Sequence, residues 1–327
     1  MEYKEAIEQF NLLFSHKMKD AEIKSFLIDL YKRGETADEI AAAAKVMREH
    51  SIKLPVNQSL QEKLIDNCGT GGDKSGSFNV STTASFVLAG SGLYVAKHGN
   101  RSITSKSGSA DVLEALGIKL DLTPEKQVKL LEETGFTFIF AINHHPAMKF
   151  IMPIRKSIDH RTIFNLLGPL TNPAGVKKQL IGVFDTKYID KVAYSLQINQ
   201  AKSAMVVSSH DGMDEISISA PTNFALLKDG NISTGEINPE NFGIKLANFD
   251  EIRGGDKDYN ANLMQDILKG SITDARQDIV ILNTAAALLV DGIARDMQDG
   301  IEIARETISK GDAFSALKQT IEVSNRL

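Results

Sequence analysis

The chain has 327 residues, of which 42% are hydrophobic and 24% are charged. This balance argues against a disordered or fibrous protein, and the length favours two structural units over one. The net charge of −5 argues against general nucleic-acid affinity but leaves room for a local basic pocket. A single cysteine, Cys68, the lack of an apolar signal segment and short apolar runs predict a cytoplasmic protein without a disulfide or membrane segment.

The first part of the chain is predicted to be all-helical. Apolar residues recur at three- and four-residue spacing between Ile23 and Tyr31. Thr36 and Glu39 then have the spacing of a capping box, in which each side chain bonds a free amide at the start of the next helix. We therefore expect a helical domain over residues 1–63 and a second domain over residues 64–327.

From Leu64 onward, short β-rich runs alternate with helical segments. The runs lie at residues 94–96, 136–140, 180–183 and 204–207. Strands separated by helices indicate parallel βαβ units, so the predicted class is α/β with a mainly parallel central sheet. Asp229-Gly230 between two apolar runs predicts a hairpin at the sheet edge, and the tail from Tyr259 is predicted to be helical.

The densest run of glycines and hydroxyls spans residues 66–83 and leads into a helical pattern. Such a run can turn backbone amides and a helix N-terminus toward one anion. It is not a Walker loop, because Asp73 stands where a glycine must precede the lysine, and Gly69-x-Gly71 is not completed to the dinucleotide fingerprint. The glycines alone leave two interpretations open: a phosphate site, or a structural turn with Ser81 as the helix N-cap.

A second polar run, residues 97–111, follows the next predicted strand and also ends in a helix. Lys97, Arg101 and Lys106 supply positive charge that suits a pyrophosphate. Because open α/β sheets bind ligands outside the carboxyl ends of their strands, we expect both runs to share one crevice. Solvated surface charge is the common alternative for any single lysine or arginine such as Lys97 or Arg101.

Together the two runs closely resemble the anthranilate phosphoribosyltransferase family. The family pattern is a Gly-Thr-Gly-Gly-Asp loop, then Asn-x-Ser-Thr, then Lys-His-Gly-Asn-Arg, and all three occur, at residues 69–73, 79–82 and 97–101. The similarity continues through residues 145–149, 153–155, 161–173, 212–215 and 254–256. Several motifs in the family's order are far more specific than any one of them.

The resemblance implies transfer of the 5-phosphoribosyl group from phosphoribosyl pyrophosphate to the amine of anthranilate, a step of tryptophan biosynthesis. The positions that match the family's phosphoribosyl pyrophosphate site come almost entirely from the two polar runs. They are Gly69, Gly72, Asp73, Ser77, Asn79, Ser81, Thr82, Lys97, His98, Gly99, Asn100, Arg101, Ser102, Ile103, Thr104, Ser105 and Ser109.

The resemblance also implies two Mg²⁺ ions, held by Ser81, Asp214 and Glu215. Mg²⁺ prefers hard oxygen ligands and usually takes one or two carboxylates together with substrate phosphates. Without the resemblance, Asp214-Glu215 before an expected strand at residues 216–218 would more often be an exposed turn. The seven histidines show no metal-ligand spacing, so zinc is not expected.

For anthranilate, the resemblance implies a site between the two domains, with Arg155, Asn100 and His98 as catalytic residues and His145 along the approach. The guanidinium of Arg155 suits a carboxylate, and Asn100 suits an amine. The residues alone favour a surface loop for His144 and His145. The family's usual form further implies a helical segment near residues 150–175 that returns to the first domain, and a homodimer through the helical domains.

Two other functions remain as alternatives. A pyrimidine nucleoside phosphorylase shares the architecture but uses inorganic phosphate and a nucleobase; Arg155, Asn100 and the Asp214-Glu215 pair favour the transferase. A nucleic-acid-binding relative is the other, and the negative net charge counts against it because such a binder needs a broad basic face.

Overall fold

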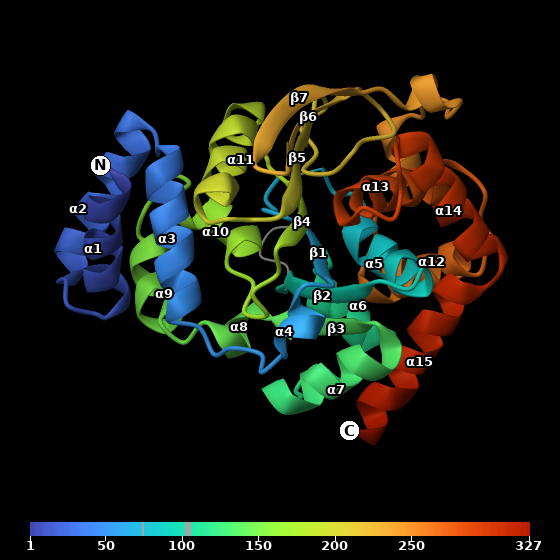
Figure 1. Ribbon diagram of the computed structural model, residues 1–327, viewed down its shortest axis with the longest axis horizontal. Coiled ribbons are helices and arrows are strands. Elements are labelled where there is room, and N and C mark those ends of the chain that lie inside the picture. Colours follow the sequence, from blue (N-terminus) through green and yellow to red (C-terminus); the bar gives the residue numbers. More distant parts are fainter. Residues whose placement is uncertain (74, 102–105) are drawn as a thin grey trace.

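A seven-stranded sheet lies at the centre of the computed structural model, which describes residues 1–73, 75–101 and 106–327 (Figure 1). Its strand order is β3-β2-β1-β4-β5-β6-β7. The strands are β1 (Leu64–Gly69), β2 (Tyr94–Gly99), β3 (Phe136–Phe140), β4 (Lys178–Gly182), β5 (Ser203–Ser209), β6 (Thr222–Lys228) and β7 (Asn231–Ile237). The first five pair in parallel, and β6 and β7 pair antiparallel at one edge.

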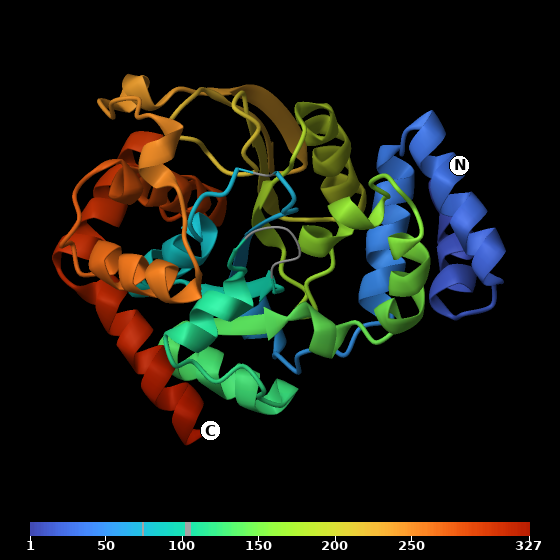
Figure 2. The same ribbon diagram turned by 180° about the vertical axis from the view of Figure 1, so that it is seen from behind.

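Helices precede, separate and follow these strands. They are α1 (Tyr3–Phe14), α2 (Asp20–Arg33), α3 (Ala37–Glu49), α4 (Gln58–Gln61), α5 (Val80–Gly90), α6 (Ser109–Ala115), α7 (Pro124–Thr134), α8 (Ala141–His144), α9 (Met148–Lys156), α10 (Phe164–Leu170), α11 (Ile189–Ile198), α12 (Lys257–Leu268), α13 (Ala275–Asp291), α14 (Met297–Ser309) and α15 (Asp312–Arg326). Figures 1 and 2 show α1, α2 and α3 on one side of the sheet and the last four helices on the other.

Alternate residues of the strands face two separate hydrophobic cores. In β5, Met205 and Val207 pack in the core that contains the C-terminal helices, whereas Ala204 and Val206 pack in the core that contains the N-terminal helices and α11. This alternation follows the two-residue period of a strand. Both faces of the sheet are therefore covered, as is usual for parallel strands.

The N-terminal helices form the small helical part of the fold. The amide of Glu39 donates to Thr36 Oγ1 at 3.3 Å and the amide of Thr36 donates to Glu39 Oε2 at 3.0 Å, which confirms the capping box. Helix α1 packs along α3, and α9 returns from the middle of the chain to contact α2. Residues 148–156 thus lie against helices formed by the first 33 residues.

The predicted class, a small helical domain with a large α/β domain around a mainly parallel sheet, is confirmed. The hairpin prediction is confirmed too: Asp229 and Gly230 have φ angles of 51° and 74°, as a two-residue turn between twisted strands requires. No described helix is long and apolar enough to span a membrane.

Two local expectations are wrong. Residues 216–218 do not form a strand, because the Ile216 amide donates to the side chain of Asn283 in α13 at 2.9 Å instead of to a neighbouring strand. Helix α5 begins at Val80 with Asn79 as its N-cap, so Ser81 lies inside the first turn. The Ser81 side chain is therefore not a helix cap.

Candidate active site

The two polar loops meet at the carboxyl ends of neighbouring parallel strands. One follows β1 and leads into α5, and the other follows β2 and leads into α6. The hydroxyl of Thr82 in α5 donates to Ser109 Oγ in α6 at 3.0 Å, which joins the starts of the two helices. The helix N-termini that follow the two loops are thereby held side by side, an arrangement suited to an anion.

Asn79 connects these loops to the C-terminal half of the chain. Its side-chain amide donates to the Ser107 carbonyl at 3.3 Å, and its Oδ1 accepts from Asn260 Nδ2 in α12 at 3.0 Å. Asn260 also accepts from the Gly255 amide at 2.8 Å. We did not predict a role for Asn260, and its position after the Gly254-Gly255-Asp256 motif was the one signal for it.

The Gly254-Gly255-Asp256 motif itself lies against the first loop. The Gly254 amide donates to the Gly76 carbonyl at 2.8 Å, and Ser77 forms an isolated antiparallel bridge with Arg253. A Cβ atom on Gly254 would lie 2.8 Å from the Ser77 carbonyl oxygen. This glycine therefore permits two backbones to touch and fixes the position of the first loop.

Asp214 lies across the ends of β1 and β4. The Gly71 amide donates to Asp214 Oδ2 at 2.6 Å, and the Asp214 side chain is buried at 8% exposure, so the exposed-turn alternative is wrong. Gly69 and Gly182 are register partners in the sheet. A Cβ atom would lie 2.2 Å from Asp214 Oδ2 if placed on Gly69 and 1.6 Å from the Asp214 carbonyl oxygen if placed on Gly182.

We therefore predict that Gly182→Ala displaces the Asp214 segment. Overlap with backbone cannot be relieved by a rotamer change, so the free energy of unfolding should fall by roughly 1–3 kcal/mol or more. Gly168→Ala is the matched control, because a Cβ atom there meets nothing within 4 Å. Urea denaturation of both variants measures the difference in the free energy of unfolding. Equal midpoints would show that the contact between Gly182 and the Asp214 segment does not affect stability.

Asp214 and Glu215 are crowded with like charge. Burial raises the pKa of Asp214, and the nearby Asp73 carboxylate raises it further. Burial also raises the pKa of Glu215, with a further rise from Asp214 that Lys97 and a hydrogen bond with Ser81 partly oppose. Within the described ranges no group of three or more His, Cys, Asp or Glu residues has a metal-binding arrangement. With Asp73 beside it, the pair offers carboxylate oxygens together with the Ser81 hydroxyl, and such an all-oxygen set suits a hard divalent cation that also binds substrate oxygens.

Lys97 is a buried charge, not a solvated one. Its side chain is 1% exposed, and Nζ donates to the Asn67 carbonyl at 2.5 Å. The Asn67 side chain in turn donates to the Ser81 carbonyl at 2.8 Å and accepts from Ser85. Lys97 thus places positive charge close to the start of α5. Asn67, which connects the two, is a second positioning residue that sequence reasoning missed.

His98 and His145 form a buried pair. His98 Nδ1 lies 2.8 Å from the Gly168 carbonyl oxygen, so we assign a proton to it. Its Nε2 then accepts from His145 Nε2 at 3.2 Å, which leaves His145 Nδ1 unprotonated and without a hydrogen-bond partner among the described residues. Burial lowers the pKa of His98 to about 4 and that of His145 to about 3, so both rings are neutral at pH 7.

The surface-loop prediction for His144 and His145 is wrong. Both side chains are buried, because His144 Nδ1 lies 2.7 Å from the Ile52 carbonyl and His145 packs on His98. The segment that carries both histidines connects the end of β3 with the helical part of the fold. Residues 141–145 follow β3, and Ile52 belongs to the connection that leaves the helical part.

The low pKa of His98 predicts a pH-dependent loss of stability. Its folded-state pKa of about 4 lies below the unfolded value of 6.5, so the unfolded chain binds the proton first and stability falls as the pH drops through that window. The loss is on the order of 3 kcal/mol. Urea denaturation between these pH values should show a steeper fall for the wild type than for His98→Asn. Parallel pH profiles would contradict the neutral assignment.

Arg155, near the end of α9, has a guanidinium without a carboxylate partner in the described part of the chain. Its guanidinium lies 5.3 Å from the centre of the Phe164 ring and makes one long contact, 3.7 Å, to Met152 sulfur. Partial burial lowers its pKa, although the group stays charged at neutral pH. An unpaired, partly desolvated guanidinium is suited to a ligand carboxylate.

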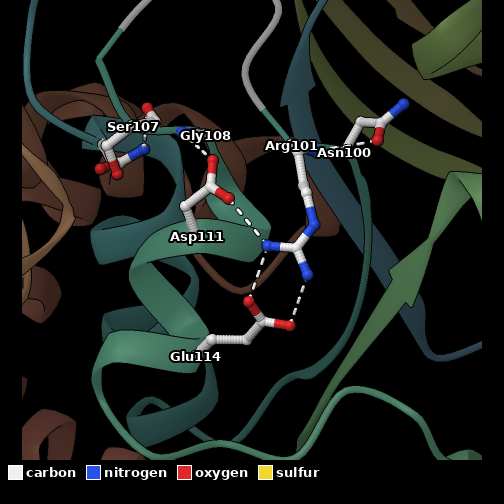
Figure 3. Close-up of polar contacts among 7 residues, drawn as sticks. Asn100, Arg101, Ser107, Gly108, Asp111 and Glu114 are labelled. Atoms are coloured by element: carbon white, nitrogen blue, oxygen red, sulfur yellow. Dashed lines mark hydrogen bonds and ion pairs between the residues drawn. The ribbon is translucent and has the colours of Figure 1, made fainter.

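Arg101 is held by two carboxylates of α6 (Figure 3). Its guanidinium donates to both oxygens of Glu114, at 2.7 and 2.6 Å, and to Asp111 at 2.9 Å. The Glu114 bonds and then the Asp111 bond raise its pKa. Its neighbour Asn100 is exposed, and the Asn100 side-chain oxygen accepts from the Arg101 amide. The predicted positions Ser102, Ile103, Thr104 and Ser105 lie outside the described residues.

Arg161 is a further residue that sequence reasoning did not assign to the site. Its Nη2 donates to the Gly72 carbonyl, and its guanidinium stacks 3.7 Å from the centre of the Phe184 ring. The preceding residue, His160, stacks on Tyr31 of α2 at 3.8 Å. The first polar loop is thus linked to the helical part of the fold through two consecutive residues.

Comparison with known proteins places this geometry in a family. Residues 61–314 match the family model described as "Glycosyl transferase family, a/b domain", and residues 1–51 match the "helical bundle domain" of the same family. A relative from Persephonella marina named anthranilate phosphoribosyltransferase is 46% identical over 96% of this chain and 92% of its own.

Solved structures agree with the sequence relatives. The crystal structure of anthranilate phosphoribosyltransferase from Thermus thermophilus aligns with a TM-score of 0.93 and 37% identity, over 99% of this chain and 96% of that one. The Saccharomyces cerevisiae enzyme, solved in complex with PRPP and Mg, aligns with a TM-score of 0.88 and 27% identity, over 100% and 94%. With its fold, its two polar loops and its carboxylate pair, the chain belongs to the anthranilate phosphoribosyltransferase family.

Proposed function

We propose that this protein transfers the 5-phosphoribosyl group of phosphoribosyl pyrophosphate to the amine of anthranilate, giving N-(5-phosphoribosyl)anthranilate and pyrophosphate in tryptophan biosynthesis. The observation that carries the proposal is that Asp214, Glu215 and both phosphate loops meet at one edge of the sheet. An unpaired guanidinium, that of Arg155, is available for the carboxylate of anthranilate.

The phosphoribosyl pyrophosphate would lie along the two loops. Backbone amides from residues 69–73 and hydroxyls at the start of α5 and α6 supply neutral donors, and Lys97 supplies a buried positive charge. Arg101 would have to exchange at least one of its carboxylate partners to reach a phosphate. For the other positions predicted to bind phosphoribosyl pyrophosphate we propose the same role, including those that lie outside the described residues.

Ser81, Asp214 and Glu215 would hold Mg²⁺, for which we propose two ions with substrate bound. The fit rests on the donor set, which is all oxygen, and on the burial and then the like-charge repulsion that raise the pKa of both carboxylates; a bound cation would offset that repulsion. When bound, Mg²⁺ would stabilise negative charge on the departing pyrophosphate.

The residues of this chain then have to position the amine. An aromatic amine is neutral at pH 7, so its lone pair is available without prior loss of a proton. Arg155 would hold the carboxylate and Asn100 would orient the amine in line with C1. As the bond from nitrogen to C1 forms and the bond from C1 to pyrophosphate breaks, one amine proton is released to solvent.

The neutral pair of His98 and His145 is better suited to positioning than to proton transfer. Both nitrogens of His98 are already engaged, and the pKa of each ring is far below neutrality. His145 Nδ1 is the one nitrogen of the pair that is left to accept a hydrogen bond from a ligand. We propose that the pair lines the approach of anthranilate.

A pyrimidine nucleoside phosphorylase is the alternative to test against. Purified protein is incubated with anthranilate, phosphoribosyl pyrophosphate and Mg²⁺, and separately with uridine and inorganic phosphate, and the products are identified by mass spectrometry. The proposal expects the phosphoribosyl adduct in the first reaction and no free nucleobase in the second. Nucleobase release without adduct would replace the transferase by the phosphorylase.

We also propose a cytoplasmic homodimer joined through the helical domains.

A further inference from the structure

A cavity of about 630 Å³ is lined by none of the residues proposed for the substrates or Mg²⁺. Its walls come from the start of α1, the end of α3, the connection around residues 53–61, the loop at residues 173–175 and the end of α11 at residues 198–200. These last three segments precede β1, β4 and β5 in the chain. The cavity therefore lies toward the amino ends of the strands, whereas the phosphate loops follow the carboxyl ends.

The cavity is lined by more positive than negative side chains. Lys45, Arg48 and Lys53 line it, and Glu49 is the one carboxylate among its described lining residues. A smaller cavity of about 260 Å³ shares Arg48 and adds Lys177, which is already paired with Glu62. The main cavity thus carries an excess of positive charge in a chain whose net charge is −5.

Arg48 is the central cation of this group. In the described part of the chain, no carboxylate lies within ion-pair distance of its guanidinium, and the guanidinium donates no hydrogen bond. Burial lowers the pKa of Arg48, and burial followed by repulsion from Arg48 lowers the pKa of Lys53. Lys53 Nζ donates to the main-chain carbonyl of Arg48, and both residues line the cavity.

We propose that this cavity binds a small organic anion whose carboxylate or phosphate group is held by Arg48 and Lys53. A guanidinium fork matches either group in geometry, and a partly desolvated cation gains most from an anionic partner. The cavity volume falls in the usual range for small-molecule sites, about 300–1,000 Å³. Because the cavity shares no residue with the proposed substrate and Mg²⁺ site, the proposal does not rest on the proposed transferase activity.

The test is isothermal titration of inorganic phosphate and, separately, of acetate into the full chain, Arg48→Gln and Arg48→Lys. Anion binding at the two polar loops is the same in all three proteins, so it cancels in the comparison. We expect at least one anion to bind about tenfold more weakly, or not at all, to Arg48→Gln, with partial retention in Arg48→Lys. Loss for phosphate alone would identify a phosphate group as the recognised anion, and loss for acetate alone a carboxylate group.

Identical isotherms for the wild type and Arg48→Gln with both anions would overturn the proposal. So would a change in sedimentation coefficient without a change in anion binding, because the cavity would then be a contact between copies of the chain. If Arg48→Gln does not fold by circular dichroism, Lys53→Gln replaces it, since Lys53 lies in the connection after α3 and outside any helix. The same weakening is then expected, and its absence would equally overturn the proposal.

Discussion

The double substitution Asp214→Asn/Glu215→Gln is expected to lower kcat/KM by about a thousandfold or more. The two carboxylates are the proposed Mg²⁺ ligands, and a metal ion at a departing phosphate contributes several kcal/mol, with each 1.36 kcal/mol equal to a factor of ten. The fold should persist, because burial, followed by repulsion from neighbouring carboxylates, raises both pKa values and the neutral amides remove that burden. Initial rates of pyrophosphate release measure the loss.

The matched control for this variant is Glu132→Gln/Glu133→Gln. It removes two adjacent negative charges from the exposed end of α7, so the net charge of the two variants is equal. We expect the control to keep near wild-type kcat/KM and the same Mg²⁺ dependence. Comparable rates in the control and in Asp214→Asn/Glu215→Gln would remove the carboxylate pair from the mechanism.

Arg155→Gln is expected to raise KM for anthranilate by roughly tenfold to a hundredfold, with KM for phosphoribosyl pyrophosphate unchanged. A hydrogen bond to a charged group contributes about 1.5–3 kcal/mol, and no carboxylate of the described chain competes for this guanidinium. Arg155→Lys keeps the charge without the fork and should give an intermediate value. Steady-state kinetics at saturating phosphoribosyl pyrophosphate provides the measurement.

The adjacent residue supplies the control for Arg155. Lys156 is exposed at the end of the same helix, so Lys156→Gln removes one positive charge and leaves Arg155 in place. Its KM for anthranilate should stay at the wild-type value. An unchanged KM in Arg155→Gln would show that the carboxylate is held elsewhere.

Local features of the fold were predictable because local chemistry determines them. The capping box of Thr36 and Glu39 depends on two side chains three residues apart. The turn at Asp229-Gly230 depends on residues that tolerate positive φ. The β-rich runs that predicted β2, β3, β4 and β5 reflect burial on both faces of a parallel sheet.

Features that depend on distant parts of the chain were not predictable. The sequence around Gly182 contains no sign that Asp214 will lie on it, because that contact exists only once β1 and β4 have paired. Lys97 was expected either as a phosphate ligand or as surface charge. It is buried instead, and its ammonium donates to the Asn67 carbonyl, which the pairing of β1 and β2 brings within reach. The link from Arg161 to Gly72 is of the same kind.

The most direct test of the account is the loss of anthranilate fluorescence when the purified wild-type protein is mixed with phosphoribosyl pyrophosphate and Mg²⁺. We expect fluorescence to fall with time, one pyrophosphate to appear for each anthranilate consumed, and EDTA to stop both. Constant fluorescence in correctly folded protein, with both substrates and Mg²⁺ present, would contradict the proposed transferase function.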